Sequence, residues 1–303
     1  TSPSDDDYTS TEAQGDADVG GCESLGKDPA TYFEESVKLY PTLLSKYARG
    51  SNQFKKNQQS YVDLLVKLGT FYAGRAEGRE GAAKQNNLKL AEATFEKAAA
   101  IFRAEGDLEK TATTYKVIAD DLSEGDLKDT YYKRAAAEYH KAGKIEAEAA
   151  YLAVVGRRYI ARVRNLTVRL GDRVLYYNKA IPYLSEALRL YQQLGKQQEG
   201  ASIHQSLGTV YLNVGRHDEA LASYKSALDY SLSTNDTKLL PRDHYNVGRA
   251  LENKGDKDGA KKRLWISSML PEQRNTMRKS FVSWANSRLN LSQLAGREMQ
   301  KPV

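Results

Sequence analysis

The chain of 303 residues contains one cysteine, Cys22, and this scarcity excludes two kinds of architecture. A single cysteine can form neither an intramolecular disulfide nor a zinc site of several cysteines. Only seven prolines occur, which is compatible with long helices. No apolar run approaches the roughly 18 residues of a membrane span, so we expect a soluble chain. Because the chain begins at Thr1, we expect a processed or truncated N-terminus, and the compartment stays open.

Motifs of catalysis, metal binding and phosphate binding are also missing. The sequence has no HExxH, no GK[ST] loop and no GxSxG, and its four histidines form no cluster of metal-ligand spacing. His204 and His244 lie 40 residues apart, and both fall at the fourth place of a repeated unit described below. Such a repeated place favours a structural role over ligation. We therefore expect no catalytic residue, no metal, no cofactor and no small-molecule substrate.

Charge is unevenly distributed along the chain, whose net charge is +6. Eight acidic residues and Lys27 give residues 1–28 a net charge of −7, so the remaining residues carry +13. The first 28 residues also lack large apolar side chains, and they cannot bury enough surface to offset the entropy of ordering. The sequence therefore predicts a disordered acidic tail over 1–28, followed by a basic body.

From Pro29 to about Arg297 the apolar residues follow helical periodicity, and no strand pattern is found. The segment 201–232 has a spacing of small and large residues that is partly repeated 40 residues later. Its marker residues are Leu207, Gly208, Tyr211, Ala220, Tyr224 and Ala227, and the later copy has Val247, Gly248, Leu251, Ala260 and Leu264. Gly208 and Ala220 indicate close approach of two helices, and Tyr211, Tyr224 and Ala227 are expected to fill the seam between neighbouring hairpins.

Three earlier copies have the same order with weaker matches. The first pairs Leu68, Gly69 and Tyr72 with Ala91, Phe95 and Ala98; the second pairs Ile118 and Ala119 with Tyr132–His140; the third pairs Val155, Gly156 and Tyr159 with Ala180, Leu184 and Ala187. The small marker residues are 50, 37, 52 and 40 residues apart. In the third copy the second helix is predicted to begin near Asn178, with Pro182 in its first turns.

These residues resemble the tetratricopeptide repeat, most strongly at 175–232. The resemblance implies an all-α, right-handed solenoid of about five helix hairpins with flanking helices at both ends. We expect an N-terminal helical segment over 29–54, interrupted near Pro41, repeats over 55–270, a capping helix over 271–297 and a short tail over 298–303. The cap carries an apolar stripe of Met277, Phe281, Trp284, Leu291 and Leu294. The alternative for this stripe is a docking helix for a partner.

The resemblance also implies a concave groove lined by the first helix of each hairpin. The positions that would face it are Ser202, Gln205, Thr209, Leu212 and Asn213 in one repeat, and Arg242, Tyr245, Arg249, Glu252 and Asn253 in the next. The clamp that some members use for a C-terminal carboxylate is not supported, since Gln205 and Thr209 stand where it needs lysine and asparagine. Arg242, Arg249 and Asn253 suit an acidic or polar peptide.

A second basic feature is predicted on one long helix that starts near Ala147. Arg158, Arg162, Arg169 and Arg173 would form a stripe along it. The stripe is either a solvated flank whose arginine stems cover apolar surface, or a docking strip for an acidic peptide, phosphate groups or the acidic tail.

Two functions follow from the sequence. The first is a non-catalytic protein–protein interaction scaffold or assembly factor that binds a protein or peptide partner in the groove. The alternative is a basic adaptor for a polyanion, either nucleic acid or an anionic membrane surface, with a SNAP-like membrane-fusion adaptor as a narrower case. The identity of the partner stays open.

Overall fold

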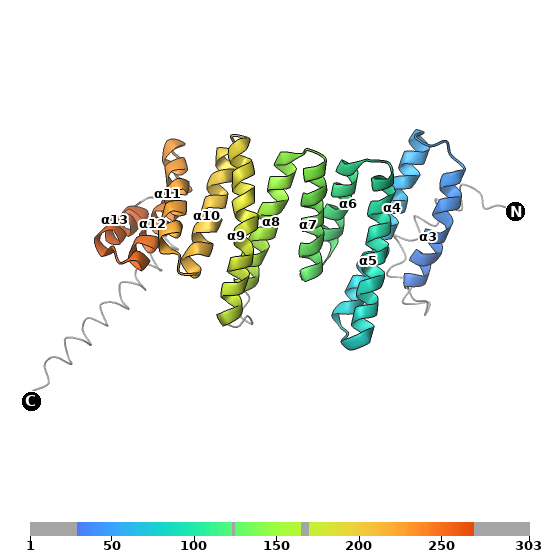
Figure 1. The fold of residues 1–303 in the computed structure, drawn as a ribbon, viewed down its shortest axis with the longest axis horizontal. Helices are drawn as coiled ribbons and strands as arrows, with labels where there is room; N and C mark the ends of the chain where they lie inside the picture. The colour runs from blue at the N-terminus through green and yellow to red at the C-terminus, as the bar shows by residue number, and fades with distance from the viewer. Residues whose placement is uncertain (1–28, 123–124, 165–169, 270–303) are drawn as a thin grey trace, which may run out of the picture. The chain divides into compact units, whose positions relative to one another are not determined.

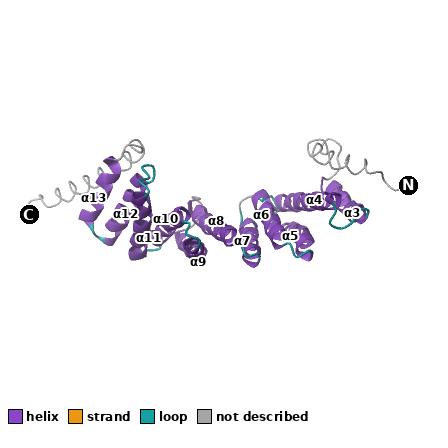
Figure 2. Cartoon of the chain, turned by 90° about the horizontal axis from the view of Figure 1, so that it is seen from above, coloured by secondary structure: helices purple, strands orange, loops and turns teal. Residues whose placement is uncertain are grey.

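The protein is described by a computed structural model over residues 29–122, 125–164 and 170–269 (Figure 1). These residues form eleven α-helices joined by loops, without a strand among them (Figure 2). The predicted all-α fold is therefore confirmed. The chain divides into two compact units, residues 1–151 and 152–303, and the boundary falls within one helix, α8 (Ile145–Arg164).

Unit 1 contains a flanking helix and two helix hairpins. The helices are α3 (Pro29–Ser45), α4 (Asn52–Glu77), α5 (Gly81–Ala104), α6 (Leu108–Asp121) and α7 (Asp126–Lys141). Helix α4 packs on α5, and α6 packs on α7, which confirms the predicted pairing. A Cβ atom added to Gly69 would lie 2.5 Å from Cδ1 of Phe95, so the small residue lies where the two helices approach most closely.

Helix α3 continues through Pro41, so the predicted interruption there is wrong. A proline inside a helix removes one backbone hydrogen bond and crowds the preceding turn. Val37 and Leu43, on either side of Pro41, are both buried in the packed unit. The burial of these two side chains offsets the cost of placing a proline inside the helix. The sequence alone does not show that burial.

Unit 2 contains the rest of α8 followed by α9 (Leu170–Gln193), α10 (Gln197–Asn213), α11 (His217–Ser233), α12 (Leu240–Lys254) and α13 (Lys257–Met269). These helices form three hairpins, α8/α9, α10/α11 and α12/α13, and each has a glycine at its closest approach. An added Cβ would lie 2.6 Å from Cγ of Leu184 at Gly156, 2.6 Å from Cδ1 of Tyr224 at Gly208 and 2.9 Å from Cγ of Leu264 at Gly248. With the two hairpins of unit 1, the described residues form the five hairpins that the repeat pattern predicted.

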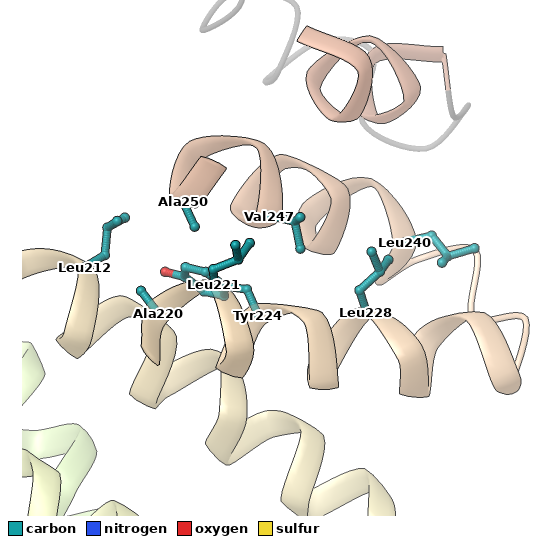
Figure 3. Packing of buried hydrophobic residues seen from close by; sticks show 8 residues of the cluster. All are labelled: Leu212, Ala220, Leu221, Tyr224, Leu228, Leu240, Val247 and Ala250. Carbon is teal, nitrogen blue, oxygen red and sulfur yellow. The ribbon is translucent and has the colours of Figure 1, made fainter. Parts of the chain in front are cut away.

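The core between the last two hairpins is a cluster of apolar side chains from α10, α11 and α12 (Figure 3). Its buried members are Leu212, Ala220, Leu221, Tyr224, Leu228, Leu240, Val247 and Ala250. Tyr224 belongs to this seam, as predicted, and its ring also lies against Gly208 within its own hairpin. The ring of Tyr224 therefore packs both within its own hairpin and against the next hairpin in the chain.

Helix α9 begins at Leu170, well before the predicted start near Asn178. Pro182 consequently lies in the interior of α9, and its predicted place in the first turns is wrong. The acidic tail over 1–28, the capping helix over 271–297 and the tail over 298–303 lie outside the described residues. No helix of the described part is long and apolar enough to cross a membrane.

Candidate functional site

The first helices of the three hairpins in unit 2 contact one another through polar side chains. Nη2 of Arg157, on α8, donates to Oγ of Ser202, on α10, at 3.0 Å. Nε2 of Gln205, on α10, donates to Oδ1 of Asp243, on α12, at 2.5 Å. We use the name first-helix face for the surface of α8, α10 and α12 on which these contacts lie. It carries the residues that the repeat pattern placed toward a ligand.

Besides Ser202, two more of the predicted ligand-facing residues on α10 bond to other helices of the protein. Gln205 is bound to Asp243 as described, and Oγ1 of Thr209 lies 3.1 Å from the hydroxyl of Tyr224. The Thr209 hydroxyl also donates to the carbonyl of Gln205 at 3.0 Å. Leu212, a third groove position, is buried in the core cluster. The polar side chains of Gln205 and Thr209 therefore join helices, and most of their hydrogen-bonding groups are already paired within the protein. They are less available to a partner.

Asp243 is the central acceptor of this face, and sequence reasoning missed it. Its side chain is fully buried, and its carboxylate accepts hydrogen bonds from Oγ of Ser231 at 2.5 Å and from Gln205. Nε of Arg242 lies 3.4 Å from the same carboxylate. Burial raises the pKa of the Asp243 carboxyl, and the bonds from Ser231 and Arg242 counteract part of that rise. The carboxylate therefore joins α10, α11 and α12 at one buried point.

The exposed cations of the face lie on α12 and α8. The guanidinium of Arg249 is placed over the ring of Tyr245, with 5.9 Å between its central carbon and the ring centroid. The side chain of Arg242 remains 43% exposed despite its contact with Asp243. Asn253 is exposed and donates to the carbonyl of Arg249 at 2.8 Å. On α10, Asn213 makes the corresponding bond to the carbonyl of Thr209 at 2.7 Å.

Arg157 is a residue of this face that the sequence analysis overlooked, although a signal was present. It directly follows Gly156, just as Thr209 follows Gly208 and Arg249 follows Gly248. The three residues therefore occupy the same place in three consecutive hairpins. Arg157 is exposed, and its bond to Ser202 holds the guanidinium over the junction of α8 and α10.

The predicted arginine stripe on one long helix is wrong as a single-helix feature. Arg158 and Arg162 lie on α8 (Ile145–Arg164), whereas Arg173 lies on a separate helix, α9 (Leu170–Gln193). Arg169 lies outside the described residues. Tyr159 of α8 lies against Tyr176 and Tyr183 of α9, so the two helices lie side by side, whereas the apolar periodicity of the sequence continues without a proline and did not reveal two helices. The guanidinium of Arg162 lies over the rings of Tyr159 and Tyr176, at 5.9 and 5.8 Å from their centroids.

The two histidines 40 residues apart occupy equivalent places on α10 and α12. Burial lowers the pKa of His204, and burial together with the charge of Arg263 lowers that of His244. Nδ1 of His244 lies 3.2 Å from Nη1 of Arg263, so this nitrogen accepts and the imidazole is neutral. Among the described residues, no group of three or more potential ligands is arranged to hold a metal ion.

Unit 1 contains a charged network that joins α5, α6 and α7. Arg134 pairs with Glu96, and Arg103 donates to the hydroxyl of Tyr115, which itself donates to Oε2 of Glu96 at 3.0 Å. Arg103 also lies 3.9 Å from the buried carboxylate of Glu138. Nζ of Lys141 also donates to Glu138 at 2.9 Å, so the cations and carboxylates of this network are paired with one another, which suits it to holding helices together.

Comparison with known proteins identifies one segment of the chain. The family model described as tetratricopeptide repeat matches residues 177–233, which include most of α9, α10 and α11. No curated protein sequence matches the chain. The solved structures it resembles include putative kinesin light chain repeats of Podospora anserina, at 14% identity over 83% of this chain and 99% of that one, with a TM-score of 0.39.

Two further solved structures are similar at the same level. One is a tetratricopeptide-repeat protein of Thermus thermophilus, with 18% identity over 63% of this chain and 97% of that one and a TM-score of 0.34. The other is BtubC (BKLC) of P. vanneervenii, with 18% identity over 71% and 92% and a TM-score of 0.32. At these values the likenesses carry no information on activity or partners.

Proposed function

We propose that this chain, in which residues 177–233 are tetratricopeptide repeats, is a non-catalytic interaction protein that binds an acidic or polar peptide segment of a partner. Tetratricopeptide-repeat arrays commonly serve as protein–protein interaction scaffolds, because stacked hairpins present an extended surface. The binding surface is the first-helix face of unit 2. The observation that carries the proposal is the placement of Arg157, Arg242 and Arg249 on this face, while its central carboxylate, Asp243, is buried.

The chemistry of the face favours carboxylates as ligands. Guanidinium groups bind carboxylates with two parallel hydrogen bonds, and such charge-assisted bonds are stronger than neutral ones. Ser202 positions Arg157, and the ring of Tyr245 supports Arg249, so both guanidiniums lose less conformational freedom on binding than unsupported side chains. Asn213 and Asn253 stand exposed one turn beyond Thr209 and Arg249 and supply amides for a peptide backbone.

The test uses the full chain and two labelled peptides, one with two aspartates and one with two lysines in their place. Charge reversal by Arg157→Glu or Arg249→Glu should weaken binding of the aspartate peptide about tenfold or more, as expected for a lost charge-assisted contact. Arg189→Glu is the matched control. It reverses one charge on α9, a second helix, where Arg189 pairs with Glu186 one turn earlier.

Three outcomes would contradict the proposal. Equal losses in all three variants would indicate an effect of net charge alone, and unchanged affinity in both face variants would remove the face as the site. Tight binding of heparin that falls steeply with salt and is insensitive to Arg157→Glu would favour the alternative, a polyanion adaptor.

A further inference from the structure

A hollow of about 500 Å³ lies in unit 2 among α9, α10 and α11. Its lining comes from the C-terminal parts of the second helices α9 and α11 and from the N-terminal half of α10. Leu188 and Tyr191 contribute apolar surface, and His204, Asp229 and Tyr230 also border it. None of the predicted ligand-facing residues lines it, so the hollow is separate from the first-helix face.

The part of the hollow between Leu188 and Gly200 has an equivalent place 40 residues later, where two leucines lie in one buried cluster. The turns before α10 and α12 correspond, because Gly195 and Asn235 both have positive φ, at 66° and 49°. In this register Leu188 corresponds to Leu228, and Gly200 corresponds to Leu240. Leu228 and Leu240 belong to the same buried cluster, and Figure 3 shows them on facing helices.

Gly200 has no side chain to correspond to that of Leu240. A Cβ atom added there would have as its nearest neighbour Cδ1 of Leu188, at 3.7 Å, which is ordinary van der Waals contact. The backbone around Gly200 therefore leaves room for a larger residue. Leu188 is left without the aliphatic contact that Leu228 receives from its counterpart. The unfilled space suits an aliphatic side chain about the size of leucine.

The charges around the hollow indicate what should accompany that side chain. Asp229 is exposed on α11, and no hydrogen bond or ion pair joins its carboxylate to the side chain of another described residue. Lys196 also borders the hollow, but it already takes part in an interaction within the chain. The unpaired carboxylate is therefore complementary to a cation next to the aliphatic group. His204, whose pKa is lowered by burial, adds no positive charge at neutral pH.

We infer that this hollow binds a partner peptide through a leucine-sized aliphatic side chain seated against Leu188 and Gly200, with a neighbouring lysine or arginine paired to Asp229. The inference concerns a different surface from the first-helix face and does not depend on the function proposed above. Burial of one aliphatic side chain accounts for about ten- to hundredfold in affinity. The salt bridge at the exposed rim adds less and weakens with salt.

The experiment follows the full chain by NMR during titration with an uncharged-end hexapeptide that has a central leucine–lysine pair. Two peptides serve as controls, one with serine for the leucine and one with glutamate for the lysine. We expect saturable shifts confined to the lining of the hollow, and at least tenfold weaker binding of the serine peptide. The inference would be overturned if binding were so weak that the Kd exceeded about 10 mM. It would also be overturned if the shifts appeared only on the first-helix face.

Variants fill the hollow or remove its charge. Gly200→Leu copies the residue that the next repeat has, so it should keep or raise the melting temperature and abolish binding of the leucine–lysine peptide. Gly200→Ala fills less space and should weaken binding by a smaller factor, which keeps the test available if the larger residue impairs folding. Undiminished binding in both variants would refute the proposal.

Asp229→Asn should weaken binding of the leucine–lysine peptide at low salt, with a difference that shrinks as salt rises. Asp258→Asn is the matched control, since it removes an exposed carboxylate of α13 that does not line the hollow. Equal effects of these two substitutions would show that net charge, and not the rim of the hollow, sets the affinity.

Discussion

Gly208→Ala tests whether the repeat register has the physical meaning assigned to it. The added Cβ would lie 2.6 Å from both Cδ1 and Cε1 of Tyr224, closer than carbon atoms in contact can approach. The ring has little freedom to move, because Tyr224 is 2% exposed and its hydroxyl lies 3.1 Å from that of Thr209. Either the ring must leave its place in the core cluster or α10 and α11 must separate.

The cost of overpacking at Gly208 can be separated from the gain in helix propensity by comparison with Gly200, a second glycine on the same helix. Replacing glycine by alanine inside a helix stabilises it by about 0.8–1 kcal/mol through backbone entropy. At Gly200 the new methyl group has space, so Gly200→Ala should show that gain. At Gly208 overpacking costs about 1–3 kcal/mol against the same gain. Since the propensity contribution is common to both, the two variants should differ in unfolding free energy by about 1–3 kcal/mol.

The measurement is urea unfolding of the full chain, followed by the fluorescence of Trp265 on α13. The chain has two tryptophans, so a Trp284→Phe background leaves Trp265 as the single reporter in unit 2. Circular dichroism of the same samples reports whether both units unfold in one transition. Equal stability of Gly208→Ala and Gly200→Ala would refute the claim that Gly208 marks a close helix contact.

Two further predictions concern the buried polar groups of unit 2. Asp243→Leu should destabilise the chain by about 1–3 kcal/mol, because Ser231 and Gln205 lose their buried acceptor, whereas Asp243→Asn keeps an acceptor and should cost less; equal losses in urea unfolding would contradict this. His204 has a folded pKa below its ordinary value of 6.5, so the neutral form is favoured in the folded state. Its contribution is therefore fully present above pH 6.5 and is lost as pH falls toward the lowered pKa. The loss of stability on acidification should be smaller in His204→Leu, and parallel profiles would show that His204 is not responsible.

The candidate site was only partly visible in the sequence. Arg242 and Arg249 were found because the repeat register assigns them to the ligand side of a first helix. Arg157 was missed, although it follows Gly156 as Arg249 follows Gly248. Periodicity shows which face of a helix a residue occupies, but it does not show which side chain of the next helix it meets. The bond between Gln205 and Asp243 could therefore not be foreseen.

The sequence by itself determined the hairpins and their pairing. A small residue is required wherever two helices cross closely, so Gly69, Gly156, Gly208 and Gly248 mark every such crossing except that of the second hairpin, where Ala119 stands. Tertiary structure alone decided that α8 and α9 are two helices packed against each other, because the apolar period of the sequence does not separate them. It also decided which polar groups face a partner and which bond inward. That choice depends on the distance between neighbouring helices, which is set by the packing of residues far apart in the chain.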